Sequence, residues 1–154
     1  MKKILITGSN GLLGQKLVKQ LKDHPDFELI ATSRGANRIS DQQGYTYHEM
    51  DILQVESVEE TFQKFQPEVV IHTAAMTNVD ACESDKEGCW ELNVTAVQLL
   101  ISEAEKYQSH FIHLSTDFVF DGKDGPYKEE DLPNPVSYYG ESKLAAEEIV
   151  KQCS

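Results

Sequence analysis

Short apolar runs and helically spaced apolar stripes alternate along this chain. The runs, which are typical of parallel strands covered on both faces, occupy residues 3–6, 27–32, 69–72 and 110–114, and a less apolar segment at 45–50 resembles a further strand. Stripes with apolar residues three or four positions apart occur at 13–21, 55–65 and 90–107, and a last helix is predicted to begin near Ser137. This alternation predicts an α/β chain built around a parallel sheet.

The segment at residues 7–14 reads Thr-Gly-Ser-Asn-Gly-Leu-Leu-Gly and lies where the first predicted strand ends and the first helix begins. Gly8 permits a tight turn, Gly11 lets backbone amides approach a pyrophosphate, and Gly14 lets the helix pack closely on the sheet. The helix N-terminus adds free N–H groups and a partial positive charge. We therefore predict a dinucleotide site along this segment, in preference to an ordinary glycine turn. The further cofactor-binding residues predicted within it are Asn10, Leu12 and Leu13.

The residues after the second predicted strand bear on the choice of cofactor. In dinucleotide-binding folds an acidic residue at this point favours NAD, whereas a nearby arginine accommodates the 2′-phosphate of NADP. Here the strand runs into Ser33 and Arg34, and the next acidic residue is Asp41. This pattern favours NADP(H) over NAD(H). The alternative is that Arg34 is a solvated loop arginine.

The ends of the third and fourth predicted strands offer further contacts to a dinucleotide. Asp51 is predicted to accept a hydrogen bond from the exocyclic amine of adenine, and Ile52 to pack on the ring. The alternative for Asp51 is a cap on the next helix. Small residues after the fourth strand suit a backbone that lies against a ligand, and they are Ala74, Ala75 and Thr77.

Tyr139 and Lys143 are the candidate acid–base pair. They are four residues apart in the last predicted helix, so both side chains project from one helical face. A phenol has a reference pKa of about 10, and an adjacent ammonium favours the phenolate and lowers that pKa. The pair can then exchange a proton with an alcohol or a ketone. An amphipathic helix with an incidental Tyr and Lys is the alternative.

Two further polar residues are candidates for catalysis, one on a predicted helix and one after a predicted strand. Asn93 falls on the inward stripe of the helix at 90–107, where a buried amide needs hydrogen-bond partners. It is therefore either a structural bridge or part of a proton relay. Thr116 follows the fifth predicted strand, where its hydroxyl either contacts a substrate carbonyl or caps a turn.

Composition narrows the choice of function classes. The 154 residues carry a formal net charge of −12, which argues against a nucleic-acid or anionic-membrane surface. No apolar stretch approaches the ~20 residues of a membrane span, so we expect a cytoplasmic protein. The three cysteines form no C-x-x-C pattern, and His72 and His113 lack clustered acidic or cysteine ligands. We therefore predict no metal site.

These segments together resemble the extended branch of the short-chain dehydrogenase/reductase superfamily. Five features occur in that family's order and approximate spacing: residues 7–14, Asp51-Ile52, Asn93, Ser115-Thr116 and Tyr139-Gly-Glu-Ser-Lys143. Three segments are similar to the dTDP-4-dehydrorhamnose reductase subgroup, the sugar-nucleotide reductases of rhamnose synthesis, and they are His72-Thr-Ala-Ala-Met-Thr-Asn-Val-Asp-Ala-Cys-Glu83, Ser115-Thr-Asp-Phe-Val-Phe-Asp-Gly122 and Asn134-Pro-Val-Ser-Tyr-Tyr-Gly-Glu-Ser-Lys-Leu-Ala-Ala-Glu147.

The resemblance implies a three-layer αβα Rossmann fold, with a parallel sheet in the order 3-2-1-4-5 and helices on both faces. It implies that Tyr139 is the general acid that protonates the sugar C4 oxygen while hydride arrives from NADPH. Lys143 would bind the nicotinamide ribose hydroxyls and lower the pKa of the tyrosine. Thr116 would orient the keto oxygen, and Asn93 would support the lysine through water.

Members of this branch continue beyond the helix that carries Tyr139 and Lys143 into a smaller region that binds the nucleotide-sugar. We therefore expect residues 1–154 to form an NAD(P)-binding Rossmann domain without that C-terminal region. Such a domain is expected to bind NADP and to turn over no sugar nucleotide alone.

Two other functions remain open at this stage. The subgroup also resembles the regulatory β subunit of methionine adenosyltransferase, which binds NADP and acts as a partner-binding protein. The other is a nucleotide-sugar epimerase or dehydratase, which normally prefers NAD, and Ser33 and Arg34 weigh against it. The expected partners are a dinucleotide cofactor and a nucleotide-sugar substrate, and a homodimer is compatible with the sequence.

Overall fold

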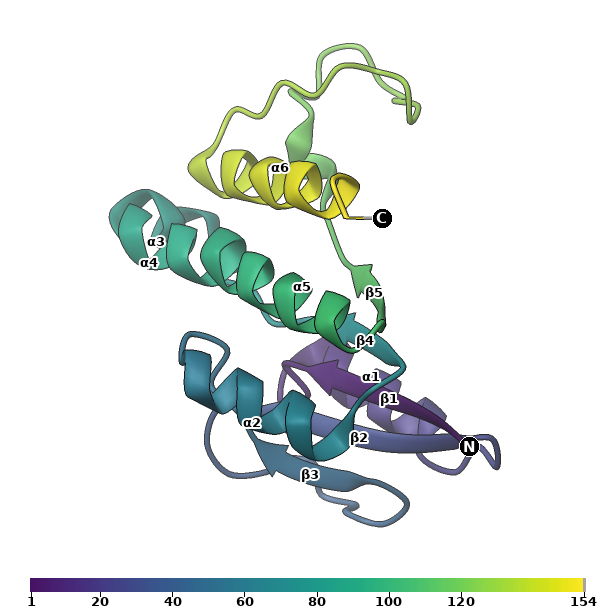
Figure 1. Cartoon of the computed structure of the whole chain (residues 1–154). Coiled ribbons are helices and arrows are strands. Elements are labelled where there is room, and N and C mark those ends of the chain that lie inside the picture. Colours follow the sequence, from purple (N-terminus) through teal and green to yellow (C-terminus); the bar gives the residue numbers. More distant parts are fainter. Residues whose placement is uncertain (154) are drawn as a thin grey trace. The chain divides into compact units, whose positions relative to one another are not determined.

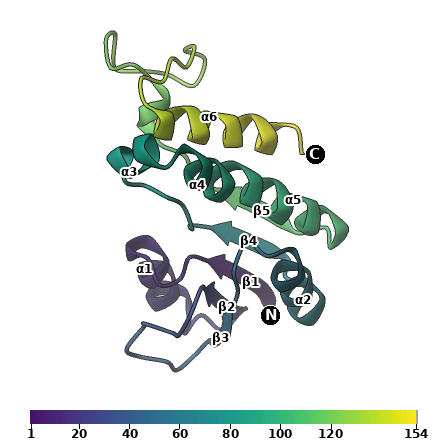
Figure 2. The same ribbon diagram turned by 90° about the vertical axis from the view of Figure 1, so that its left-hand side faces the viewer.

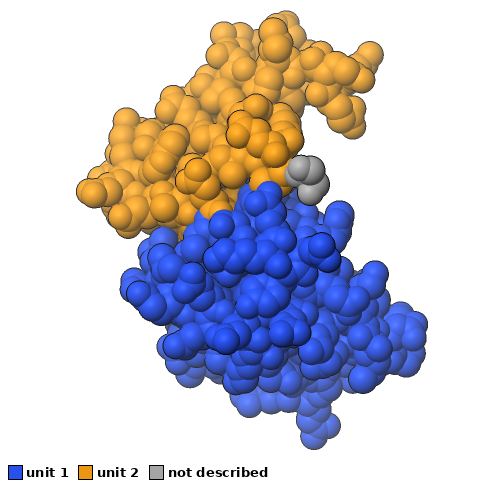
Figure 3. All heavy atoms as spheres, viewed as in Figure 1, with its two compact units in different colours: residues 1–75, 99–114 blue, residues 76–98, 115–154 orange. Residues whose placement is uncertain are grey.

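The structure, a computed structural model, describes residues 1–153 and divides into two compact units. The first unit contains Met1–Ala75 and Leu99–Leu114, and the second contains Met76–Gln98 and the chain from Ser115 onward (Figure 3). Within residues 1–153, no helix is both long and apolar enough to cross a lipid bilayer.

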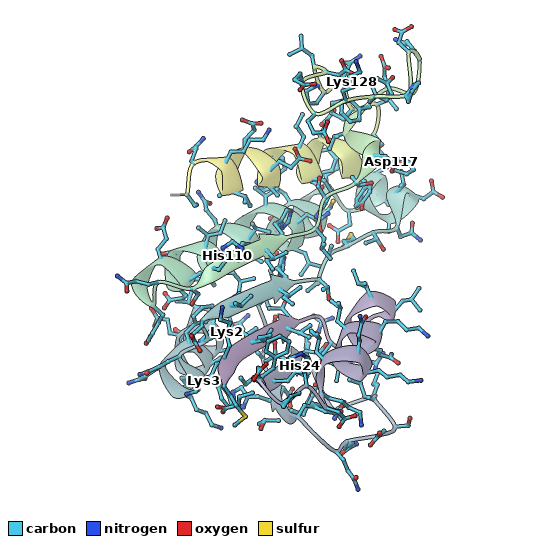
Figure 4. The ribbon with its side chains drawn as sticks, turned by 90° about the vertical axis from the view of Figure 1, so that its right-hand side faces the viewer. Lys2, Lys3, His24, His110, Asp117 and Lys128 are labelled. Atoms are coloured by element: carbon cyan, nitrogen blue, oxygen red, sulfur yellow. The ribbon has the colours of Figure 1, made fainter. Side chains whose placement is uncertain are left out.

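The first unit is organised around a five-stranded parallel sheet in the order β3-β2-β1-β4-β5 (Figure 1). This is the predicted topology, and every predicted strand is present. The register is continuous, since Thr7 of β1 pairs with both Thr32 of β2 and His72 of β4. His110, labelled in Figure 4, begins β5. The strands are β1 Lys2–Thr7, β2 Phe27–Ser33, β3 Thr46–Glu49, β4 Val69–His72 and β5 His110–His113.

Helices lie on both faces of this sheet, as the resemblance implies. Helix α1 (Leu12–Leu21) and helix α2 (Val55–Phe65) lie on opposite sides of it (Figure 2). Alternate side chains of β1 point to opposite faces, and Ile4 and Ile6 form one buried cluster with Val18 of α1. The amphipathic stripe of α2 buries Val58, Phe62 and Phe65, whereas Val55 at the start of the helix is exposed. The core of this unit therefore sits on both sides of the central strand.

The second unit is helical. It contains α3 (Val79–Ser84), α4 (Lys86–Trp90), the π-helix η1 (Glu91–Thr95), the first residues of α5 (Ala96–Lys106), the 3₁₀ turn η2 (Asp117–Val119) and α6 (Tyr138–Lys151). The predicted single helix at 90–107 is thus one run that begins earlier, at Lys86, and changes pitch at η1. A π-helical turn is rare and frequently marks a functional position.

Candidate cofactor site and acid–base site

The glycine loop after β1 is built by close backbone packing. Gly8 has a φ of +69°, which favours glycine, and a Cβ at this position would lie 2.6 Å from the backbone nitrogen of Ala74. A Cβ at Gly14 would collide with the carbonyl oxygen of Gly8, so the first turn of α1 rests directly on the loop. β1 lies between β2 and β4, where the strand order reverses. Open α/β sheets bind their ligands at such a point.

The N-terminus of α1 is open to an anion. Gly11 is the N-cap and provides no side chain to satisfy the first N–H groups, and the first turn contains no acidic residue. Leu12 is 83% exposed and Leu13 is also exposed, so neither belongs to the core. The first-turn amides and the helix dipole therefore suit a phosphate ligand.

Asn10 lies in the same loop, but its side chain contacts another segment. Its Nδ2 donates to the carbonyl oxygen of Ala36 at 3.0 Å, and its Oδ1 accepts from the backbone N–H of Arg38 at 2.8 Å. Sequence analysis assigned Asn10 to the cofactor and gave no sign of this link, because the two segments are far apart in the sequence.

The residues predicted at the other strand ends lie in the first unit as well. Ser33 ends β2, and its carbonyl oxygen accepts from the N–H of Met50 at 3.1 Å. Arg34 is exposed and forms no ion pair with a carboxylate among the described residues. Ala74 and Ala75 follow β4 and are half-buried.

Asp51 closes a turn ahead of α2 and does not cap the helix. Its Oδ1 accepts from the N–H of Leu53 at 3.0 Å, whereas the N-cap of α2 is Gln54. The alternative of a helix cap is therefore wrong, because three residues separate the carboxylate from the helix start. Ile52 is 6% exposed and belongs to the core. The adenine contacts of both residues stay predictions.

The predicted catalytic residues all lie in the second unit, and Asn93 connects its parts. The Asn93 side chain is buried, its Oδ1 accepts from the N–H of Met76 at 2.8 Å, and its Nδ2 donates to the carbonyl oxygen of Met76 at 3.0 Å. The same Nδ2 donates to Oγ of Ser142 at 3.0 Å, and Ser142 donates to the carbonyl oxygen of Tyr139 at 2.7 Å. Asn93 is therefore a structural bridge to α6, and its part in a proton relay stays a prediction.

Ser142 is a residue that sequence analysis missed. It immediately precedes Lys143 and lies three residues after Tyr139, so it faces the same interior. The signal available in the sequence was a hydroxyl at an inward helical position. Its partner was not visible there, because Asn93 lies far away in the chain.

Replacing Asn93 with Leu is expected to destabilise the chain by about 2–4 kcal/mol. The substitution leaves the N–H and C=O groups of Met76 without their partner, and each unpaired buried group costs ~1–3 kcal/mol. Urea unfolding measures the change. Thr95→Ala is the matched control, because Thr95 is exposed on the same π-helix. Equal stability of the two variants would contradict the role of the bridge.

Helix α6 has a well-defined start. Oγ of Ser137 accepts from the N–H of Gly140 at 3.2 Å, and a carboxylate oxygen of Glu83 accepts from the N–H of Tyr138 at 2.7 Å. The ring of Tyr139 packs edge-on against Phe118, with 5.9 Å between the ring centres. These contacts fix the turn of α6 that carries Tyr139.

Tyr139 and Lys143 are buried one turn apart on α6, with exposed fractions of 8% and 3%. Burial lowers the pKa of Lys143 from 10.5 to about 8, and the charge of Glu147 opposes that shift. A tyrosine and a lysine buried one turn apart on the same helix are the arrangement that the acid–base prediction requires. The roles of both side chains in catalysis stay predictions.

Lys143 is expected to make the stability of the chain depend on alkaline pH. Its folded pKa lies below the unfolded value, so the unfolded chain holds more protons between pH 8 and 10.5. The free energy of unfolding of the wild type, relative to that of Lys143→Met, should rise by about 3 kcal/mol as the pH increases from 8 to 10.5. Below pH 8 the difference should stay constant. Chemical unfolding at several pH values measures this difference. The exposed Lys64→Met is the control, and a profile parallel to that control would contradict the prediction.

Thr116 caps the turn that follows β5. Its Oγ1 accepts from the N–H of Phe118 at 3.2 Å and forms the N-cap of η2, which begins at Asp117 (Figure 4). The turn-cap alternative is therefore confirmed. The same hydroxyl donates only a 3.3 Å hydrogen bond to Asp117, which a stronger acceptor can replace. Thr77 lies in the second unit and is exposed.

His72 and His113 lie side by side on the neighbouring strands β4 and β5. They are register partners, and their rings stack with 5.7 Å between centres. Across residues 1–153, no group of three or more His, Cys, Asp or Glu side chains is arranged to hold a metal ion.

The sheet order, the glycine loop at its switch point and the Tyr139–Lys143 helix define a Rossmann-type chain of the short-chain dehydrogenase/reductase class. Within that class, the chain belongs to the family described as RmlD substrate binding domain, which matches it over residues 1–154.

The chain is similar in sequence to two named relatives and in structure to a solved reductase. The chain is 36% identical to the dTDP-4-dehydrorhamnose reductase of Aggregatibacter actinomycetemcomitans, over 97% of this chain and 47% of that protein. It is 38% identical to the methionine adenosyltransferase 2 subunit beta of Danio rerio, over 99% of this chain and 45% of that protein. The dTDP-4-dehydrorhamnose reductase of Bacillus anthracis, solved in complex with NADP, superposes with a TM-score of 0.78 at 28% identity, over 99% of this chain and 50% of that one. The chain thus spans about half the length of the curated relatives it matches.

Proposed function

We propose that the gene product containing this chain reduces a 4-keto-6-deoxy sugar nucleotide with NADPH, in the manner of a dTDP-4-dehydrorhamnose reductase. The observation that carries this proposal is the burial of Tyr139 and Lys143 one turn apart on α6. The identity to the Aggregatibacter reductase over 97% of the chain supports it.

The glycine loop fits a dinucleotide. Backbone atoms occupy the positions that a Cβ would take at Gly8 and Gly14, so the loop packs closely against α1. The open first turn of α1 would hold the pyrophosphate. NADPH supplies a hydride when it is bound. The residues that would contact the cofactor are Gly8, Gly11, Leu12, Leu13 and Gly14 at the phosphates, Ser33 and Arg34 at the adenosine ribose, Asp51 and Ile52 at the adenine, and Ala74, Ala75, Thr77, Tyr139 and Lys143 toward the nicotinamide.

The remaining residues would handle the proton and the substrate. The Tyr139 hydroxyl would donate its proton to the C4 oxygen of the sugar, and Thr116 would exchange its bond to Asp117 for one to the keto oxygen. The Lys143 ammonium would bind the nicotinamide ribose hydroxyls, and Asn93 would hold α6 in place through Ser142.

A direct assay tests the proposal. The full-length gene product is incubated with dTDP-4-dehydrorhamnose and either NADPH or NADH, and cofactor oxidation is followed by absorbance. We expect oxidation that depends on the ketosugar and is faster with NADPH. The 154-residue chain alone is expected to bind NADP without turnover. Failure of the gene product to oxidise either cofactor would contradict the reductase.

A regulatory function is the second candidate, because identity to the methionine adenosyltransferase β subunit is as high as identity to the reductase. In that case the gene product would bind NADP, leave the ketosugar unchanged and copurify with a methionine adenosyltransferase. A tightly held NAD released on denaturation would instead favour a nucleotide-sugar epimerase or dehydratase.

A further inference from the structure

The carboxamide of Asn10 joins the glycine loop to the segment that follows β2. Both of its ends are engaged, with Ala36 as acceptor at 3.0 Å and Arg38 as donor at 2.8 Å. The loop is tied to α1 in turn, because Nε2 of Gln15 donates to the carbonyl oxygen of Asn10 at 2.8 Å. A side chain that bonds to backbone at both ends restricts the position of the whole segment.

The opposite edge of this segment is held by β3. The Tyr47 hydroxyl donates to the carbonyl oxygen of Gly35 at 2.5 Å, and a Glu49 carboxylate oxygen accepts from the N–H of Gly35 at 3.1 Å. The backbone at 35–38 is therefore fixed from two sides, while the Arg38 side chain is exposed. A fixed backbone lowers the entropy that an arginine loses on binding.

Arg38 lines a pocket of about 530 Å³ together with the outer face of α1, which contributes Lys16 and Lys19. None of these three cations forms an ion pair with a carboxylate of residues 1–153. The pocket's acidic residues, Asp23 and Asp41, both lie within 4 Å of the Lys22 ammonium. In a chain with a net charge of −12, the pocket therefore concentrates uncompensated positive charge beside the glycine loop.

We propose that Asn10 is a positioning residue for cofactor choice, because it holds Arg38 where Arg38 and Lys16 together bind the 2′-phosphate of NADP. The inference rests on the proposed function and deepens it, since it assigns the phosphate to a pocket that Arg34 does not line. A phosphate monoester carries a charge of about −1.5 to −2 near neutral pH and accepts several hydrogen bonds. A guanidinium matches it with two parallel donors and an ammonium adds a point charge. NAD has a hydroxyl at this position and gains neither contact.

The test measures binding of NADP and NAD by calorimetry in the full-length gene product and its variants. Arg38→Gln and Lys16→Gln are each expected to raise the Kd for NADP roughly tenfold and to leave the Kd for NAD within about twofold. Both residues are exposed, so neither substitution removes core packing. Lys64→Gln is the control, an exposed lysine on α2 away from the pocket lining, and it should change neither Kd.

Asn10→Ala is expected to raise the Kd for NADP about tenfold, with a smaller change for NAD, because the freed segment no longer presents Arg38. Asn37→Ala is the matched control. Asn37 lies in the same segment, but within residues 1–153 its side chain bonds to Tyr45 and Ile39 and not to the glycine loop. The melting temperature is recorded for each variant.

Each outcome decides between the proposals. Equal weakening of NADP and NAD in Asn10→Ala would make Asn10 a structural residue only and overturn the inference. A wild-type preference for NADP that Arg38→Gln and Lys16→Gln leave intact would overturn the inference and keep the proposed function. A wild-type protein that binds neither cofactor would overturn both.

Discussion

Replacing Tyr139 with Phe is expected to lower the kcat of the proposed ketosugar reduction by a factor of about 10²–10⁴, the usual contribution of a general acid. Phenylalanine keeps the edge-on packing against Phe118 and the burial of the ring, and it removes only the hydroxyl that we propose as the proton donor. Binding of NADP should change little. Steady-state kinetics of the full-length gene product, with the Kd for NADP measured in parallel, checks both expectations.

Tyr138→Phe provides the matched control on the same helix. The Tyr138 ring lies against Trp90, with 6.2 Å between the ring centres, and its backbone N–H contact with Glu83 survives the substitution. We expect kcat within about twofold of wild type for this variant. A Tyr139→Phe enzyme with kcat in that same range would remove Tyr139 from the mechanism and favour the regulatory function.

Replacing Gly14 with Ala is expected to destabilise the chain through a direct collision with the backbone of the glycine loop. The added methyl group would collide with the Gly8 carbonyl oxygen and lie 2.7 Å from the Cα of Ser9. Both neighbours are backbone, so no side chain can move aside. Overpacking of this kind typically costs about 1–3 kcal/mol, and a collision with backbone belongs at the upper end of that range, above the gain of ~1 kcal/mol that alanine brings inside a helix. Urea unfolding of the chain measures the change in stability, and calorimetry measures the affinity for NADP.

Gly11→Ala separates this collision from the general effect of adding a methyl group. Gly11 has a φ of −76°, and its added Cβ would lie 3.2 Å from the Gly8 carbonyl oxygen. A small relaxation relieves that contact, so the cost should stay below about 1 kcal/mol. If Gly11→Ala destabilised the chain as much as Gly14→Ala, close packing of α1 on the loop would not explain the glycine at position 14.

Local sequence pattern predicted most elements because their cause is local. The stripe at 55–65 fixed α2 to the residue, since apolar residues at helical spacing bury one face and Pro67 prevents continuation. The run at 69–72 likewise matched β4, because its β-branched residues suit a covered strand. The π-helix at Glu91–Thr95 was not predictable, because no local signal distinguishes it from the α-helix on either side.

The sequence by itself determined the class of fold, the glycine loop and the helical spacing of Tyr139 and Lys143, because periodicity and the conformational freedom of glycine act over a few residues. The sheet order followed from the family resemblance, and the structure confirmed it. Only the tertiary structure decided what the polar side chains do. Asn10 bonds to Ala36, and Asn93 bonds to Met76 and Ser142, across long stretches of chain. Lys143 acquires its lowered pKa only through burial. Hydrogen-bond partners and desolvation depend on which distant segments the fold brings together, and no local pattern records that.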